Sequence, residues 1–333
     1  MKKLITTAFL LMALANVSYG QDANNAELAD RLLQASLGMP NAEYYIDMTT
    51  MNQPFRWVNP FPDDFEPLPN LYHETFLSPS MQKEVGYAIY LPPQYLEDNN
   101  RSFPVVYYLH GGRPGNEIKS TYIVNPLHEA MSSGAAPPVI YVFVNGGEIS
   151  HWNYLPTTSM GEDVIVKELI PYTDSNYRTV ANRSGRAIQG FSQGGRGATR
   201  IAFKYPDLFS SVAAGGGAYQ VEKQIAENNG VEYDIRSRNP ERLDFGIGND
   251  AYSLAQSYSV SNSHKLKIAF WGGTEGFNYD GILEYMEYLD SLDIGYKSYF
   301  GVGIGHNSWQ LYQVIGFDLM NFHANVFETS ARD

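Results

Sequence analysis

One serine in the sequence is crowded by glycines, in the stretch Ile-Gln-Gly-Phe-Ser-Gln-Gly-Gly at positions 188–195. Gly190, Ser192 and Gly194 fit the pattern Gly-x-Ser-x-Gly, in which a strand turns sharply into a helix and holds a serine hydroxyl above a sheet. The flanking glycines suit a turn that larger residues would obstruct. The pattern favours Ser192 as a catalytic nucleophile over the alternative, a serine that only caps a helix.

A serine hydroxyl needs a neighbouring base, because it is a weak nucleophile until its proton is taken. Of the seven histidines, His306 lies in the glycine-rich stretch GVGIGHNSWQLY, between the last predicted strand and the last predicted helix. The order serine, acid, histidine is the one expected for this kind of turn. We therefore predict that His306 is the general base.

A carboxylate should orient the histidine, and the stretch Gly-Thr-Glu-Gly-Phe-Asn-Tyr-Asp at positions 273–280 offers two. Glu275 is nearer to the end of the preceding strand, where such folds present catalytic side chains. Asp280 is suited to capping the helix that follows. The sequence favours Glu275 as the acid and leaves Asp280 as the alternative.

Acyl transfer also needs backbone N–H groups that stabilise the oxyanion, one of them from the residue after the serine. Gln193 occupies that position. The second donor is expected from His110-Gly111-Gly112 at the end of a predicted strand, and we choose the N–H of Gly112. A glycine turn without a functional role is the alternative for this segment.

Two further side chains are candidates for substrate binding. His151 and Trp152 follow the predicted strand VIYVFVNGG, on the same edge of the sheet as Ser192, and either line the pocket or pack within a loop. The acidic pair Glu162 and Asp163 is typical of a helix start. No metal site is predicted.

Apolar runs that end in glycine alternate with segments of helical spacing along most of the chain. The predicted strands include VGYAIYLPPQY (85–95), FPVVYYLHGG (103–112), VIYVFVNGG (139–147), RAIQGF (186–191), SVAAGGG (211–217) and KLKIAFWGG (265–273). Alternation of strands and helices implies a mainly parallel sheet with helices on both faces. The fold class predicted is α/β.

The domain organisation is expected to be simple, because no internal repeat or long linker is visible. Residues 21–84 are rich in proline, asparagine and aromatic residues and are interpreted as an extension packed on the core. Residues 85–330 form the predicted catalytic domain. Within it, the loop-rich segment 230–264 is the candidate for a cap or lid over the site.

The first twenty residues have the layout of a secretory signal peptide, with two lysines before an apolar run and small residues at the end. Cleavage is expected before Gln21, which predicts a secreted or periplasmic protein. The apolar run is shorter than the roughly 20 residues of a spanning helix. We expect no membrane span after cleavage.

The formal net charge of -13 and the absence of cysteine restrict the function classes further. An acidic protein without a basic face is a poor partner for nucleic acid. A chain without cysteine forms no disulfide, thiolate metal site or cysteine nucleophile.

Several of these stretches together resemble a known family. YAIYLPPQY, FPVVYYLHGG, GFSQGGRGA, YPDLFSSVAAGGG, GGTEG and GHNSW, within about residues 70–325, are similar to the esterase D and feruloyl esterase type of α/β-hydrolase, known as carbohydrate esterase family 1. The resemblance implies an α/β-hydrolase fold and hydrolysis of carboxylic esters by Ser192, His306 and an acid, with no cofactor. Members often have aspartate where this chain has Gly276, and related mycolyltransferases use glutamate in this loop.

The sequence thus predicts an exported serine esterase that acts through an acyl-enzyme. Feruloyl or acetyl esters of carbohydrates are substrates that only the resemblance suggests. The alternatives are an acyltransferase or peptidase with the same triad, and a non-catalytic carbohydrate-binding protein that retains the fold. The sequence leaves the substrate and the oligomeric state open.

Overall fold

The structure is a computed structural model, and it describes residues 55–63, 65–66, 68–113, 115–234, 241–261 and 266–330. The expected signal peptide and most of the expected extension 21–84 lie outside these residues. No helix in the described ranges combines the length and the apolar character needed to cross a membrane.

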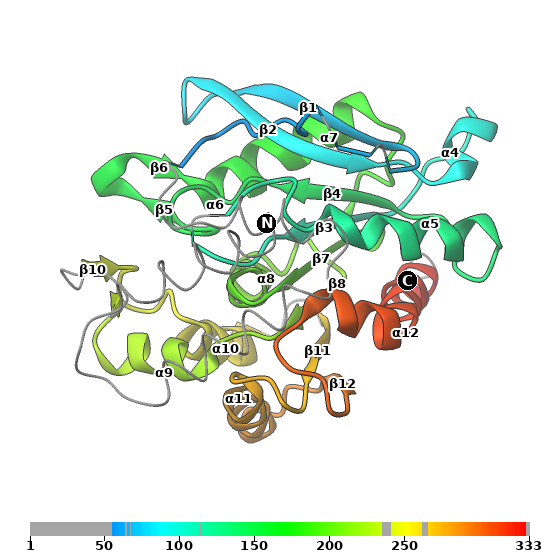
Figure 1. Cartoon of the computed structure of the whole chain (residues 1–333). Helices are drawn as coiled ribbons and strands as arrows, with labels where there is room; N and C mark the ends of the chain where they lie inside the picture. The colour runs from blue at the N-terminus through cyan, green and yellow to red at the C-terminus, as the bar shows by residue number, and fades with distance from the viewer. Residues whose placement is uncertain are drawn as a thin grey trace, which may run out of the picture.

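Eight strands form the central sheet, in the order β1-β2-β4-β3-β7-β8-β11-β12 (Figure 1). They are β1 (Leu71–Ser78), β2 (Lys83–Tyr90), β3 (Val105–Leu109), β4 (Ile140–Val144), β7 (Arg186–Phe191), β8 (Ser211–Gly215), β11 (Lys267–Gly273) and β12 (Lys297–Gly301). The six strands from β4 to β12 in this order are parallel, whereas β2 is antiparallel to both β1 and β4. The predicted α/β class with a mainly parallel sheet is confirmed.

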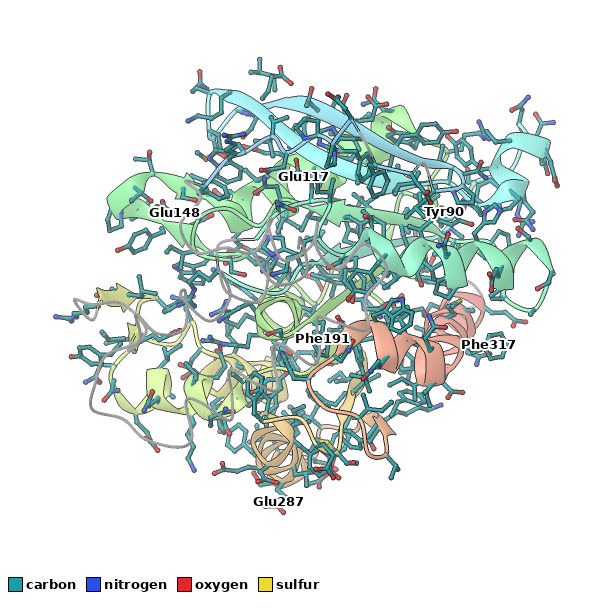
Figure 2. All side chains as sticks on the ribbon, viewed as in Figure 1. Tyr90, Glu117, Glu148, Phe191, Glu287 and Phe317 are labelled. Atoms are coloured by element: carbon teal, nitrogen blue, oxygen red, sulfur yellow. The ribbon has the colours of Figure 1, made fainter. Side chains whose placement is uncertain are left out.

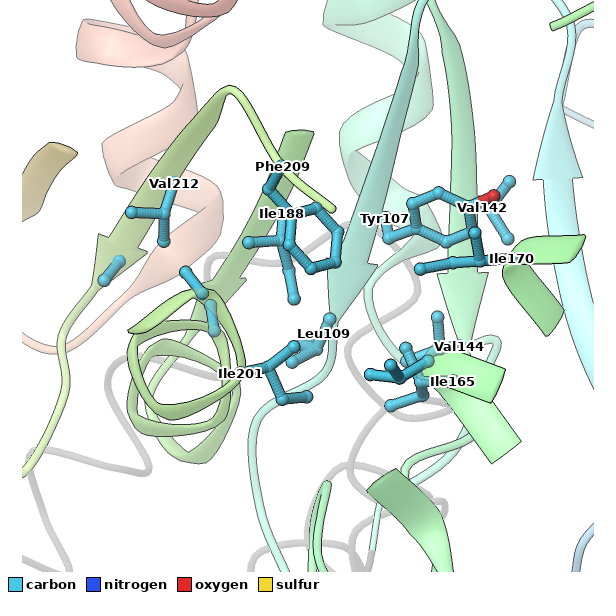
Figure 3. Close-up of a cluster of buried hydrophobic side chains, with 14 of the residues drawn as sticks. Tyr107, Leu109, Val142, Val144, Ile165, Ile170, Ile188, Ile201, Phe209 and Val212 are labelled. Carbon is cyan, nitrogen blue, oxygen red and sulfur yellow. The ribbon is translucent and has the colours of Figure 1, made fainter. Parts of the chain in front are cut away.

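The central strands are buried on both faces, which explains why they are continuous apolar runs in the sequence. Along β3, Tyr107 and Leu109 belong to one hydrophobic cluster, and Val106 and Tyr108 belong to the other. Figure 3 shows part of the first cluster, where Ile201 of a helix packs near Leu109. The sheet therefore separates two cores.

Helices cover both faces of the sheet, as predicted. One face packs against η3 (Val164–Leu169, a π-helical segment), α7 (Ile170–Asn176), α8 (Gln193–Lys204) and α11 (Tyr279–Ser291), with α10 (Ala251–Ser261) outside α8. The other face packs against α5 (Val124–Ser132) and α12 (Ser308–Ser330). The remaining elements are α4 (Pro93–Glu97), η1 (Thr121–Ile123), β5 (Asn153–Tyr154), η2 (Leu155–Thr157), β6 (Ser159–Met160), α6 (Gly161–Asp163), η4 (Arg183–Gly185) and α9 (Tyr219–Glu227).

Two segments differ from the sequence-based expectation. The sheet begins at Leu71, inside the expected extension, because β1 pairs along its whole length with β2. The segment 230–264 is more regular than the loop-rich stretch expected. It contains the hairpin of β9 (Val231–Asp234) and β10 (Glu241–Asp244), followed by α10. We call this hairpin with α10 the insertion.

Candidate active site

Ser192 lies on the sharp turn between β7 and α8. Its backbone adopts φ 60° and ψ −118°, outside the regions that side-chain-bearing residues prefer. Its N–H donates to the carbonyl oxygen of Gly215 at the end of β8, at 2.8 Å. Strained backbone of this kind concentrates at functional sites. Phe191, the preceding residue, is labelled in Figure 2.

The glycines around Ser192 are required by close backbone contacts. A Cβ added at Gly194 would lie 2.0 Å from the carbonyl oxygen of Leu109 on β3. A Cβ at Gly190 would lie 2.3 Å from the carbonyl oxygen of Gly194 itself. The first turn of α8 is therefore pressed against the ends of the strands, which answers why glycine is concentrated here.

The predicted oxyanion donors, Gln193 and Gly112, lie on two chain segments that meet at Ser192. Gln193 begins α8, and the first N–H groups of a helix have no partner within it. Opposite, a Cβ built on Gly111 would lie 3.2 Å from the Cβ of Ser192, so the loop after β3 touches the serine. Gly112 follows with φ 83°, in the left-handed region that glycine tolerates.

His110 holds this loop in place, a role that the sequence analysis did not assign. Its Nε2 accepts the N–H of Gly146 at 3.1 Å, and its Nδ1 therefore donates to the carbonyl oxygen of Gly111 at 3.2 Å. Burial, together with the ammonium of Lys119, lowers the pKa of His110 to about 3. The ring is thus neutral and structural.

His306 lies on the loop between β12 and α12 and faces the turn that carries the serine. Its ring packs between Phe191 and Phe277, with centroids 4.5 and 4.3 Å away. A Cβ on Gly216, next to the carbonyl that binds the Ser192 N–H, would lie 2.9 Å from its Cε1. The strands therefore bring the loops of Ser192 and His306 to the same glycine turn.

The imidazole of His306 is held in its neutral, basic form. Burial and, second, the ammonium of Lys119 lower its pKa to about 3. Burial also lowers the pKa of Lys119 to about 8. In the described part of the chain, neither the Ser192 hydroxyl nor the His306 ring has a hydrogen-bond partner. Catalytic hydrogen bonds often tighten only when substrate binds.

The two candidate acids occupy different places. Glu275 lies on the loop after β11, where its N–H donates to Ile304 on the histidine loop at 3.0 Å. Asp280 is exposed in the first turn of α11. The N-cap of that helix is Asn278, not Asp280. A Cβ on Gly276 would lie 3.7 Å from the backbone nitrogen of His306, so this loop contacts the histidine loop directly.

His151 and Trp152 are both buried, at 1% and 7% exposure. The His151 ring lies 4.5 Å from that of His110, and its Nδ1 pairs with the Ser150 hydroxyl at 3.0 Å. Trp152 packs against Phe245, the residue directly after β10, with ring centroids 5.2 Å apart. Substrate contact by either residue stays a prediction, and their burial favours a packing role.

An elbow serine and a neutral histidine, on loops that meet at one glycine turn at the carboxyl edge of a mainly parallel sheet, are features of an α/β-hydrolase. The chain belongs to the family described as "Putative esterase", whose model matches residues 78–276, more than half of the sequence. This confirms the predicted family and the predicted α/β-hydrolase fold.

Curated relatives match part of the chain. Esterase Rv1288 of Mycobacterium tuberculosis is 29% identical over 161 residues, which are 47% of this chain and 34% of the relative. An endo-1,4-beta-xylanase/feruloyl esterase of Xylanibacter ruminicola is 27% identical over 179 residues, 49% of this chain and 24% of the relative. The match thus spans about a third or less of these relatives' own length.

Solved structures share the fold. A ferulic acid esterase superposes with a TM-score of 0.63 at 20% identity, covering 77% of this chain and 98% of its own. The fluorophosphonate-binding serine hydrolase FphF of Staphylococcus aureus gives a TM-score of 0.62 at 15% identity, covering 76% and 98%.

Proposed function

We propose that the protein is an exported serine carboxylic-ester hydrolase that works through an acyl-enzyme. The observation that carries the proposal is the placement of Ser192 on a strained strand-to-helix turn whose preceding residue, Phe191, packs against the ring of a neutral His306. Family membership supports the same reaction class.

In the proposed reaction the Ser192 oxygen attacks the ester carbonyl carbon while His306 takes the hydroxyl proton. The carbonyl oxygen becomes an oxyanion, which the N–H groups of Gln193 and Gly112 stabilise. As the tetrahedral intermediate collapses, His306 returns the proton to the departing alcohol. Water then attacks the acyl-enzyme with the same base, releasing the acid and restoring the serine.

The test of this reaction is the Ser192→Ala variant. The hydroxyl is the attacking group, so hydrolysis of p-nitrophenyl acetate should fall by about 10⁶-fold. Labelling by a fluorophosphonate should disappear, while circular dichroism and the thermal midpoint stay close to those of the wild type. A variant that kept its full turnover would remove Ser192 from the mechanism.

Glu275 is the acid that we propose for orienting His306, since its loop is bonded to the histidine loop through Ile304. Glu275→Gln should lower kcat by about 10⁴-fold, as loss of a triad acid does elsewhere. Asp280→Asn is the matched control, because Asp280 is exposed as Glu275 is but lies in the first turn of the helix that follows. If only the Asp280 variant lost its activity, the assignment would pass to Asp280.

For the substrate we propose aromatic or acetyl esters of carbohydrates. The Xylanibacter ruminicola relative carries feruloyl esterase in its name, which favours feruloyl esters. Methyl ferulate, an acetylated xylo-oligosaccharide and simple aryl acetates should be compared by kcat/KM. A clear preference for long aliphatic acyl chains would contradict the proposal.

Export is proposed from the lysines and apolar run of residues 1–20. Expressed in a bacterium, the full-length chain should appear outside the cytoplasm with Gln21 as its first residue. N-terminal sequencing of the secreted and cytoplasmic fractions checks this. Intact Met1 on cytoplasmic protein alone would contradict it.

A further inference from the structure

A group of buried charges lies between the loop after β3, helix α8 and the insertion. It consists of Arg113, Arg196, Arg200, Glu222 and Glu232, and none of these side chains is more than 7% exposed. Such charges are costly to bury unless they are paired and hydrogen-bonded. Each charge in this group has a defined partner, and two of the arginines adjoin the segments that flank Ser192.

Glu232 of β9 joins two arginines from different segments. Its Oε1 accepts from Nη1 of Arg113 at 2.9 Å, and its Oε2 accepts from Nη2 of the same residue at 3.3 Å. Oε2 also accepts from Nη2 of Arg196 at 2.9 Å. The two guanidinium groups hold the pKa of Glu232 well below its usual range. The carboxylate is thus ionised at neutral pH.

Arg113 and Arg196 each adjoin a residue that carries a proposed oxyanion donor, the first along the chain and the second through a hydrogen bond. Arg113 directly follows Gly112 in the chain. Arg196 lies one turn into α8, and its Nη1 donates to the side-chain oxygen of Gln193 at 3.1 Å. The same arginine donates its backbone N–H to the carbonyl oxygen of Ser192 at 3.2 Å. Glu232 therefore connects the two chain segments that carry the proposed oxyanion donors.

Glu222 fixes the other side of this arrangement. It accepts from Nε of Arg196 at 2.5 Å, and its second oxygen accepts the N–H of Ala251 at the start of α10, at 2.8 Å. Arg196 is thereby held from two directions, by α9 and by the hairpin. Its planar guanidinium has little freedom to turn, since bidentate and charge-assisted bonds fix orientation as well as distance.

A buried ion pair often stabilises a fold no more than well-packed apolar side chains would. What this group supplies is a fixed geometry, and oxyanion stabilisation depends on donors that are already in place. Small shifts of such donors lower kcat, because the oxyanion that they stabilise develops only in the transition state. The position of Glu232 fits that requirement.

We propose that Glu232 is a positioning residue of the proposed esterase: by binding Arg113 and Arg196 together, it fixes the spacing of the Gly112 and Gln193 N–H groups that receive the oxyanion. The inference rests on the proposed function. It gives the insertion a role in the chemical step.

The test compares the wild type with Glu232→Gln on p-nitrophenyl acetate. Arg113 donates to both carboxylate oxygens of Glu232, so in either orientation of the amide the NH2 group faces an N–H of Arg113 and the fork is broken. The attraction of the carboxylate charge for Arg113 and Arg196 is lost as well. We expect kcat to fall by about 10- to 100-fold, somewhat less than for loss of a donor itself, with little change in KM. The inhibition constant of an aryl boronic acid, which forms a tetrahedral adduct on the serine, should rise by a similar factor.

The matched control is Glu162→Gln, on α6, where the carboxylate contacts the end of α8 that is far from Ser192. Glu162 is 3% exposed and pairs with Lys204 at 2.8 Å and with the Tyr205 hydroxyl at 2.6 Å, away from the oxyanion donors. It should retain kcat. An equal loss of kcat in both variants would overturn the inference, because it would reflect only the loss of a buried charge.

A second variant covers the case in which Glu232→Gln does not fold. Arg113→Lys keeps the positive charge but cannot bind both carboxylate oxygens as a fork, and it should lower kcat with KM retained. Wild-type kcat in Arg113→Lys, and in Glu232→Gln where it folds, would overturn the inference. If the wild type itself neither hydrolyses the ester nor reacts with a fluorophosphonate, the proposed function fails instead.

Discussion

At the scale of single residues, the turn that carries Ser192 has no room for a further atom. Gly194→Ala should cost at least about 3 kcal/mol of unfolding free energy and most of the esterase activity, because the new Cβ would meet the Leu109 carbonyl oxygen at 2.0 Å. Gly295→Ala is the control, since its Cβ would have no neighbour within 4 Å. Thermal unfolding and aryl acetate turnover check both, and a stable, active Gly194→Ala variant would contradict the steric argument.

At the same scale, His306 should stay deprotonated, and so able to act as the base, far into the acidic pH range. A pKa of His306 of about 3, below the ordinary 6.5, means that the ring stays neutral until the solution is strongly acidic. The acid limb of kcat/KM reports the free-enzyme base, and it should therefore lie well below pH 6.5. Lys119→Met removes a cation that disfavours protonation of His306, so the limb should move to higher pH. An unchanged limb in that variant would show that burial acts alone.

Ser192 and His306 could each be selected from the sequence as a single candidate because their local patterns are distinctive, and their catalytic roles stay predictions. Ser192 sits in a glycine pattern, and His306 follows in the expected chain order. The acid was not resolved, since Glu275 and Asp280 are close in sequence and only the course of the loop separates them. Glu232 carried no signal, because it meets Arg113 from 119 positions away in the chain.

At the scale of elements, apolar runs ending in glycine located the buried parallel strands. Strand β1 was missed because it is an edge strand with only two buried side chains, Phe76 and Ser78. An edge strand needs little apolar sequence, so periodicity does not reveal it. The hairpin β9–β10 was missed for a related reason: its strands are short, and Glu232 faces a buried ion network where an apolar residue would be expected.

The docking of this hairpin should depend on pH. The pKa of Glu232 is depressed in the folded protein. The pairing of Glu232 with the two arginines therefore contributes fully to stability above the unfolded carboxyl pKa of about 4.3. This contribution is lost as the pH falls toward the folded pKa. Glu232→Gln should lower the unfolding free energy by about 3 kcal/mol at neutral pH. The deficit should shrink in acid. Denaturant unfolding of both proteins at several pH values checks this, and a deficit independent of pH would contradict it.

At the scale of the whole molecule, the alternation of strands and helices was sufficient to predict the layered α/β fold. The reason is general: a parallel sheet requires crossovers, and helices are the usual ones. The expected cleavage before Gln21 stays a prediction, because residues 1–54 lie outside the described part of the chain.

The net charge of the whole molecule should influence which esters are turned over efficiently. With a formal charge of -13, the protein repels anions, so an acetyl ester with a sulfonated alcohol should show a kcat/KM several-fold below that of its trimethylammonium counterpart at low salt. Raising the ionic strength from about 0.01 M to about 1 M shortens the screening length from about 30 Å to about 3 Å. The difference should then largely disappear, while an uncharged ester serves as the control. Faster turnover of the sulfonated ester at low salt would mean that the ammonium of Lys119, which also acts on His306, outweighs the charge of the rest of the protein.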